Sequence, residues 1–280
     1  MRVVVTGSSG LLGRHVAAAL VAAGHTVLGI DRNPPSRDIG WEHVTADLTQ
    51  LGQTLQLVRD AEAIVHIAAI PRPTGLPAVQ VFETNMSACY NVVEAAVLNG
   101  ARRLVYASSM SVLGYPFFET PVTPSYLPFD SAHPALPQDA YALSKWLGEE
   151  IVGAAVRRRP GISAISLRMP WIQTAETFAR DIVERRRRAA LVARDLWGYL
   201  DARDAAAAFV AAVERPFDGH HRIFISAADT FMEVDTATLV RAAYPDVPIK
   251  RALPGHETVF DLAEARDLLG FEPRHGWRGY

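Results

Sequence analysis

The stretch Val3-Val4-Val5-Thr6-Gly7-Ser8-Ser9-Gly10-Leu11-Leu12-Gly13 runs from a short apolar segment into a glycine-rich turn and then into a helical pattern. Its apolar start predicts a buried strand, and its glycines predict the turn that joins this strand to a helix. Gly7 permits a tight turn, Gly10 lets backbone amides approach a pyrophosphate, and Gly13 lets helix and strand pack closely. We therefore expect a dinucleotide-binding site that Ser9, Leu11 and Leu12 line together with these glycines.

The first 170 residues continue this pattern, because short apolar runs alternate with longer helical patterns. Such alternation predicts a parallel sheet whose strands are linked by crossover helices. Runs without polar interruptions are typical of strands that are buried on both faces. We expect strands at residues 3–5, 26–30, 44, 63–67, 104–107 and 162–167, and helices at 11–23, 79–98 and 139–157.

Beyond Arg168 the pattern becomes irregular and mostly helical, with helices expected at 176–188, 204–214, 235–243 and 261–269. This change predicts an α/β fold with a small, mostly helical cap. We expect a dinucleotide-binding domain over 1–170, to which segments near 199–226 return, and a substrate-binding cap over 171–280. The aromatic residues of this half are expected in the core of the cap, where two of them can also wall a substrate pocket: Trp171 and Trp197, with Tyr199 and Phe231.

Acidic residues follow two of the expected strands. Asp31 ends the second strand, where a carboxylate accepts hydrogen bonds from the adenosine ribose and repels a 2′-phosphate, which favours NAD over NADP. Arg32 leaves NADP open, since an arginine there can hold that phosphate, although we favour a solvated turn residue. Asp47 and Leu48 are expected near the adenine, and a turn or helix cap is the competing interpretation.

Tyr141 and Lys145 lie four residues apart on an expected helix and therefore share a face. A free tyrosine has a pKa near 10, too high for a base at neutral pH. A lysine cation and an oxidised nicotinamide would lower that pKa. The strand before this helix ends in serines, and strand ends are where ligands bind in such sheets. A serine hydroxyl there can hold the substrate oxygen, or it can serve only to make the turn.

Together these motifs resemble the extended branch of the short-chain dehydrogenase/reductase family, which includes nucleotide-sugar epimerases, dehydratases and reductases. The resemblance covers nearly the whole chain. It rests on Thr6-Gly7-x-x-Gly10-x-x-Gly13, His66-Ile67-Ala68-Ala69, Asn85, Ser108-Ser109-x-x-Val112-x-Gly114 and Tyr141-x-x-x-Lys145.

The resemblance implies a doubly wound Rossmann sheet with catalytic Ser109, Tyr141 and Lys145. It implies further cofactor contacts from His66, Ala68 and Ala69, with Asn85 as a structural or proton-relay residue beside the cofactor. Substrate contacts are expected from Ser109, Ser111, Arg168 and Trp171. A homodimer packed through the helices at 79–98 and 139–157 is also implied.

Departures from the family pattern narrow the activity. The sugar dehydratases carry Asp-Glu where this chain has Met110-Ser111, which disfavours dehydration. Many nucleotide-sugar enzymes carry an asparagine where this chain has Trp171. The run from Ala107 to Tyr115 is similar to that of uronate dehydrogenases, although these carry Asn-His at positions 110 and 111. We expect an NAD-dependent oxidoreductase acting on a hydroxyl or carbonyl carbon of a sugar-like or other small polar substrate.

Two alternatives remain open. A nucleotide-sugar 4-epimerase would use the same residues in a transient oxidation and re-reduction. A non-catalytic NAD sensor or scaffold is disfavoured, because such family members usually lack the tyrosine or the lysine.

Composition excludes other classes of function. The chain has 280 residues, a formal net charge of −2 and an isoelectric point near 6.5, so nucleic acid is not an expected partner. We expect no signal peptide and no membrane span, since the apolar segment 205–213 is far too short to cross a bilayer. Cys89 is the single cysteine and an expected core residue, which fits a reducing cytoplasm.

The remaining candidates receive simple interpretations. The histidines show no metal-ligand spacing, so we expect no metal. The run from Arg185 to Arg188 is expected to be the solvated end of a helix. Asp204 is expected to cap the helix that follows it.

Overall fold

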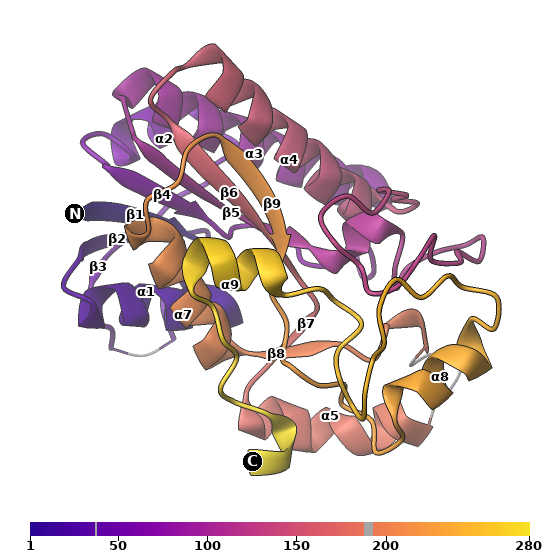
Figure 1. The fold of residues 1–280 in the computed structure, drawn as a ribbon. Helices are drawn as coiled ribbons and strands as arrows, with labels where there is room; N and C mark the ends of the chain where they lie inside the picture. Colours follow the sequence, from indigo (N-terminus) through magenta and orange to yellow (C-terminus); the bar gives the residue numbers. More distant parts are fainter. Residues whose placement is uncertain (37, 188–192) are drawn as a thin grey trace.

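The computed structural model describes residues 1–36, 38–187 and 193–280 (Figure 1). In this part of the chain, seven parallel strands form one sheet in the order β3-β2-β1-β4-β5-β6-β9. The strands are β1 (Arg2–Thr6), β2 (Thr26–Asp31), β3 (Glu42–Thr45), β4 (Ala63–His66), β5 (Arg103–Ser109), β6 (Ser163–Met169) and β9 (His220–Phe224). The order reverses direction between β1 and β4, and at such a point ligands bind beyond the carboxyl ends of the strands.

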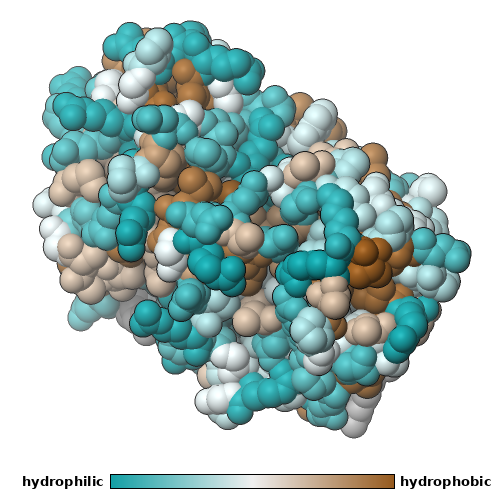
Figure 2. All heavy atoms as spheres, viewed as in Figure 1, coloured by the Kyte–Doolittle hydropathy of each residue, from teal (hydrophilic) through white to brown (hydrophobic). Residues whose placement is uncertain are grey.

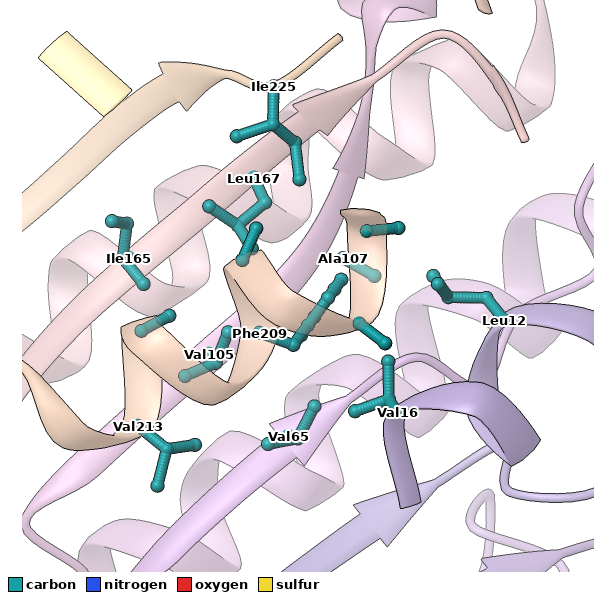
Figure 3. Close-up of a cluster of buried hydrophobic side chains, with 14 of the residues drawn as sticks. Leu12, Val16, Val65, Val105, Ala107, Ile165, Leu167, Phe209, Val213 and Ile225 are labelled. Atoms are coloured by element: carbon teal, nitrogen blue, oxygen red, sulfur yellow. The ribbon is translucent and has the colours of Figure 1, made fainter. Parts of the chain in front are cut away.

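Helices cover both faces of the sheet, because successive strand residues point to opposite sides. One face packs on α3 (Ala78–Asn99) and α4 (Ala140–Arg158), and the short α2 (Leu51–Leu57) adjoins α3. The other face packs on α1 (Leu11–Ala22) and α7 (Ala202–Glu214). Figure 3 shows Phe209 of α7 among side chains of β5 and β6 such as Val105 and Leu167. The expected doubly wound α/β sheet is thereby confirmed.

The cap is built from α5 (Ala175–Arg187), α8 (Thr236–Ala243) and the parallel pair β7 (Trp171–Gln173) and β8 (Tyr199–Asp201). Its own apolar core contains Trp197, Tyr199 and Phe231, as expected for this group of aromatic residues. The proline-rich loop before α4 joins this core through Tyr115 and Phe129. Figure 2 shows a mostly hydrophilic surface on the viewed face, with apolar residues gathered in the cap beside α8.

The chain crosses between sheet and cap several times (Figure 1). After β6 it enters the cap as β7 and α5, and it returns to the sheet as α7 and β9. It enters the cap again as α8 and comes back as α9 (Ala263–Leu269), whose Ala265 and Leu269 belong to the same core as α7. The return near 199–226 was expected. The return of α9 was not, since we expected the 261–269 helix in the cap, and the two-domain division itself stays a prediction.

Several short elements escape the sequence pattern. Strands β7, β8 and β9 lie between the helices expected in this half of the chain, where we expected no strand. Strands of three to five residues carry too few residues to show a period. The residue that caps the start of helix α7 is Asp201, and not Asp204 as we expected. The carboxylate of Asp201 accepts the amide of Arg203 at 2.7 Å. The carboxylate of Asp204 instead accepts the backbone amides of Arg274 and His275, at 2.9 and 2.8 Å. Among the described residues, no helix is both long and apolar enough to span a membrane.

Candidate active site

One cavity of about 1060 Å³ runs along the carboxyl ends of the strands, from the glycine turn to the cap. Most of the expected site residues line it. They are Gly7, Ser9, Gly10, Leu11, Leu12, Gly13, Asp31, Arg32, Asp47, Leu48, Ala68, Ala69, Asn85, Ser109, Ser111, Tyr141, Lys145 and Trp171. The arrangement places the glycine turn and the Tyr-Lys pair on the walls of the same cavity.

The glycine turn needs its glycines for steric reasons. Gly7 has a φ of +74°, and a Cβ there would lie 2.7 Å from the backbone nitrogen of Ala68. A Cβ on Gly13 would lie 1.9 Å from the carbonyl oxygen of Gly7. Helix α1 begins directly after Gly10, which has no side chain to cap the first amides. The start of α1 is therefore open to an anionic group such as a pyrophosphate.

Asp31 is held at the end of β2 by two backbone amides. Its two carboxylate oxygens accept the amides of Ser9 and Asn33, each at 3.0 Å. Asp47 likewise accepts hydrogen bonds from the amide and the hydroxyl of Thr49, at 3.0 and 2.9 Å. The hydrogen bond from the backbone amide holds the pKa of Asp47 below its usual value. Asp47 thus makes a turn and lines the cavity at the same time, so the two interpretations we weighed do not exclude each other.

Tyr141 is placed by the start of α4. The carboxylate of Asp139 caps this helix by accepting the amides of Tyr141 and Ala142 at 2.8 and 2.9 Å. Burial raises the pKa of the Tyr141 phenol to about 12, while a side-chain hydrogen bond with Ser109 acts to lower it. Ser109 lies at the end of β5, where its hydroxyl also accepts the amide of Ser111 at 3.1 Å. Ser109 and Tyr141 therefore meet on one wall of the cavity.

Lys145 lies one helical turn beyond Tyr141 and is only 4% exposed. Its ammonium donates to the carbonyl of Ala107 at 2.6 Å and lies 5.8 Å from the centroid of the Tyr141 ring. Burial lowers the pKa of Lys145 to about 8, and the charges of Cys89 and Glu149 act in the opposite direction. Ser109 is the group whose hydrogen bond opposes the rise in the Tyr141 pKa, and the effect of Lys145 on Tyr141 stays a prediction.

The cap end of the cavity is lined by residues 169–172, 184–185 and 194–195, with Phe117 from the proline-rich loop. Arg185 forms an ion pair with Asp195, and its guanidinium carbon lies 3.8 Å from the centroid of the Trp171 ring. Ser111 lines the same cavity, and its buried hydroxyl has no hydrogen-bond partner within the described chain. A polar ligand would therefore find donors and acceptors at this end.

The arginine run is not a solvated helix end where the structure describes it. Arg185 lines the cavity, and Arg186 donates to the carbonyl of Phe231 at 2.9 and 2.6 Å while its guanidinium stacks over Trp277. Arg188 and the side chain of Arg187 lie outside the described residues. The sequence pattern suggested solvent because four adjacent charges usually face water, and no local signal showed that α5 packs against Trp171.

Residues 3–226 match the family model described as the NAD dependent epimerase/dehydratase family. The chain belongs to this family. The expected family is thereby confirmed, and with it the expectation of an NAD-dependent oxidoreductase or sugar epimerase.

Curated relatives and solved structures add detail. The chain is 29% identical over 201 residues to L-arabinose 1-dehydrogenase (NAD(P)(+)) of Haloferax volcanii, covering 70% of this chain and 76% of that protein. It is 26% identical over 170 residues to uronate dehydrogenase of Pseudomonas putida, covering 60% of each. The structure of UDP-glucose 4-epimerase from Bifidobacterium longum, in complex with NAD+ and UDP, superposes with a TM-score of 0.74 at 17% identity. That superposition covers 99% of this chain and 95% of the epimerase, and it shows the shared fold alone.

Arg168, expected at the substrate, does not reach the cavity. Its side chain is 4% exposed, and its guanidinium donates to both carboxylate oxygens of Glu149, at 2.9 and 2.8 Å. Glu149 is fully buried and also accepts the hydroxyl of Ser108 at 2.6 Å. We did not identify Glu149 from the sequence, although its place four residues after Lys145 puts it on the same face of α4. The two residues join α4 to β5 and β6 behind the catalytic wall.

His66, expected to contact the cofactor, does not line the cavity either. Its ring lies behind the wall, where Nδ1 is 2.7 Å from the hydroxyl of Thr6 and the ring stacks on Tyr106. Burial, reinforced by the charge of Lys145, lowers the pKa of His66 to about 3, so the ring stays neutral. His66 therefore packs beneath the site, as the end of a buried strand would.

Asn85 of α3 lines the cavity and also binds both the loop after β4 and helix α4. Its side-chain amide accepts the backbone amide of Ile70 at 2.7 Å and donates to the carbonyl of the same residue at 3.1 Å. It also donates to the hydroxyl of Ser144 in α4 at 3.1 Å. These bonds use both ends of the amide, which supports the structural interpretation that we left open beside a proton relay.

Proposed function

We propose that this chain is an NAD-dependent dehydrogenase that oxidises a hydroxyl carbon of a small sugar-like substrate, or reduces the corresponding carbonyl. One observation carries the proposal. Ser109, Tyr141 and Lys145 lie on the wall of a cavity that also contains the glycine turn. The names of the relatives support a sugar-like substrate, since they include dehydrogenases of arabinose and of uronates.

The residues present fit the cofactor. The open start of α1 suits a pyrophosphate, and the fixed carboxylate of Asp31 suits ribose hydroxyls. Bound NAD would supply the hydride acceptor for the oxidation. Holding the reacting groups together in one cavity is itself a large part of the catalysis.

The proton is handled by the chain itself. In the oxidation, the Tyr141 oxygen accepts the proton of the substrate hydroxyl, and in the reduction it returns that proton to the carbonyl. The hydroxyl of Ser109 holds the same substrate oxygen, and the ammonium of Lys145 favours the phenolate through its charge. Because burial raises the pKa of the phenol, the oxidation direction depends on groups that favour the phenolate.

The decisive experiment follows NADH formation with free aldoses, uronates and UDP-sugars, and it follows isomerisation of the same compounds by NMR. Net NADH formation with a free sugar, by protein that needs added NAD, is the expected result. Isomerisation of a UDP-sugar without net NADH would make the enzyme a nucleotide-sugar 4-epimerase instead. NAD binding without turnover of any compound would favour a sensor or scaffold.

A homodimer in the cytoplasm completes the proposal. Helix α3 exposes Val79, Tyr90 and Leu98, and apolar residues on an exposed helix face favour burial against a partner. Cys89 is the only cysteine and is buried, which suits a reducing compartment. Light scattering of the purified protein tests the dimer, and Tyr90→Asp should convert it to a monomer. A wild-type protein that is already a monomer would contradict the proposal.

A further inference from the structure

The cap end of the cavity contains an ion pair that the proposed chemistry does not use. Arg185 comes from α5, and Asp195 precedes β8. Their side chains are 32% and 19% exposed, and both line the same cavity as Tyr141. An ion pair that supported only the fold would have no need to face the cavity. The position of this pair therefore suggests contact with the ligand.

The charges at this end balance. Among the described residues that line it, Glu184 and Asp195 are acidic, and Arg185 and Arg194 are basic. The guanidinium of Arg194 stacks over the ring of Phe118 at 4.1 Å and donates to the carbonyl of the same residue at 3.3 Å. A ligand carboxylate or diphosphate that left water here would add negative charge to an end whose described lining residues sum to zero charge, and excess buried charge is costly. Arg185, the cation beside Trp171, already has its counter-charge in Asp195.

A paired arginine and aspartate instead suit a ligand with hydroxyl groups. The guanidinium can only donate hydrogen bonds and the carboxylate can only accept them, whereas a hydroxyl can do both. The hydroxyl of Ser111 adds a buried polar group without a partner, and Trp171 adds apolar surface of the kind that lines small-molecule sites. Burial raises the pKa of Asp195 while Arg185 acts against that rise, so the carboxylate depends on its partner for its charge.

We infer that Arg185 and Asp195 form a specificity-determining pair that selects an uncharged free sugar over a sugar acid or a nucleotide sugar. This inference rests on the proposed dehydrogenase function. It separates the two kinds of substrate that the names of the relatives offer, a neutral aldose and a uronate. The pair binds the hydroxyl groups remote from the reacting carbon, and Asp195 cancels the charge with which Arg185 would otherwise attract a carboxylate.

The experiment compares sugars that differ only in whether the terminal carbon is a primary alcohol or a carboxylate, such as D-galactose and D-galacturonate. We expect wild-type enzyme with saturating NAD to give a higher kcat/KM for the neutral sugar. Asp195→Asn should move the ratio of the two kcat/KM values about tenfold toward the acid, since it frees the charge of Arg185. Arg185→Met should lower kcat/KM for the neutral sugar, mainly through KM.

Asp181→Asn is the matched control, because Asp181 pairs with Arg180 on the same helix but does not line the cavity. It should leave the ratio unchanged. Preference of the wild type for the uronate, or an unchanged ratio in Asp195→Asn, would overturn the inference while leaving the dehydrogenase function standing. Absence of NADH formation with every sugar would overturn both. The wild-type ratio needs no variant, so the test survives a variant that does not fold.

Discussion

Two pairs of an arginine and a carboxylate lie close to this active site, and their surroundings differ. The pair of Arg168 and Glu149 is enclosed, with a fully buried carboxylate that three groups from β5, β6 and β9 approach: Ser108, Arg168 and Arg222. The pair of Arg185 and Asp195 faces the cavity, where the carboxylate of Asp195 binds the guanidinium of Arg185. The enclosed pair binds the fold together, whereas the open pair is available to a ligand.

This difference indicates which part of the site is rigid. Removing one partner of an enclosed pair leaves a buried charge uncompensated, which is costly. Removing one partner of an open pair leaves a charge that water or a ligand can solvate, which costs little. The catalytic wall should therefore tolerate few substitutions, and the cap end should accept them with a change of substrate.

The largest expected effect concerns the catalytic wall itself. Tyr141→Phe removes the proton path but keeps the ring, so kcat should fall on the order of 10³-fold while NAD still binds. Ser109→Ala removes one positioned hydroxyl and should cost less, about 10²-fold. Steady-state kinetics and calorimetric titration of NAD measure the two quantities. Activity retained in Tyr141→Phe would show that another group moves the proton.

The next effect tests the enclosed pair directly. Glu149→Gln keeps the shape of the side chain but leaves Arg168 buried without a counter-charge, so the free energy of unfolding should fall by about 3–5 kcal/mol. Asp195→Asn is the matched substitution in the open pair and should cost less than ~1 kcal/mol. Urea denaturation measures both. Equal losses would erase the distinction between the two pairs.

A smaller effect concerns the cofactor end. Asp31→Ala removes the carboxylate that opposes a 2′-phosphate, so the preference for NAD over NADP should relax about tenfold. Arg32 lines the cavity nearby and would then be able to hold the phosphate. Fluorescence titration of both cofactors against wild type and variant is the measurement. Tighter binding of NADP by the wild type would mean that Arg32 outweighs Asp31.

The smallest effect is a shift in pH dependence. The carboxylate of Glu149 helps to keep Lys145 protonated, and burial sets the pKa of Lys145 at about 8. Glu149→Gln removes that help, so the pKa of Lys145 should fall and turnover should decline at a lower pH than in wild type. The other titratable groups around Lys145 are His66, Cys89, Tyr106 and Tyr141. An unchanged alkaline limb in the profile of kcat against pH would show that Glu149 acts on the fold alone.

Local spacing explains why most of the site could be predicted from the sequence. The glycines of the turn, the acid at the end of β2 and the Tyr-Lys pair each depend on a few neighbouring residues and one element type. These residues all line the cavity as expected. The parallel direction of the first strands could also be predicted, from the alternation of apolar runs and helices.

The two arginines show what such reasoning misses. Arg168 was expected at the substrate because of the family resemblance, yet Glu149 of the preceding helix α4 binds its guanidinium. Arg185 was expected in solvent because it belongs to a charge run, yet its guanidinium lies over the Trp171 ring and the residue lines the cavity. In both cases the role depends on a partner in a different element of the fold, and the spacing within one helix or strand does not identify such a partner.

The repeated crossing of the chain between sheet and cap has a consequence for how such enzymes can be recombined. The cap is not one insertion, because α7 and β9 of the sheet layer lie between its two parts, which contain α5 and α8. Transplanting a cap from a relative therefore requires two separate grafts with matched junctions at β6, β8, β9 and α9. A single recombination point within this half of the chain would join one part of a foreign cap to the other part of the native cap. New substrate preferences should consequently arise more readily by point substitution within α5 and its surroundings than by exchange of the whole cap.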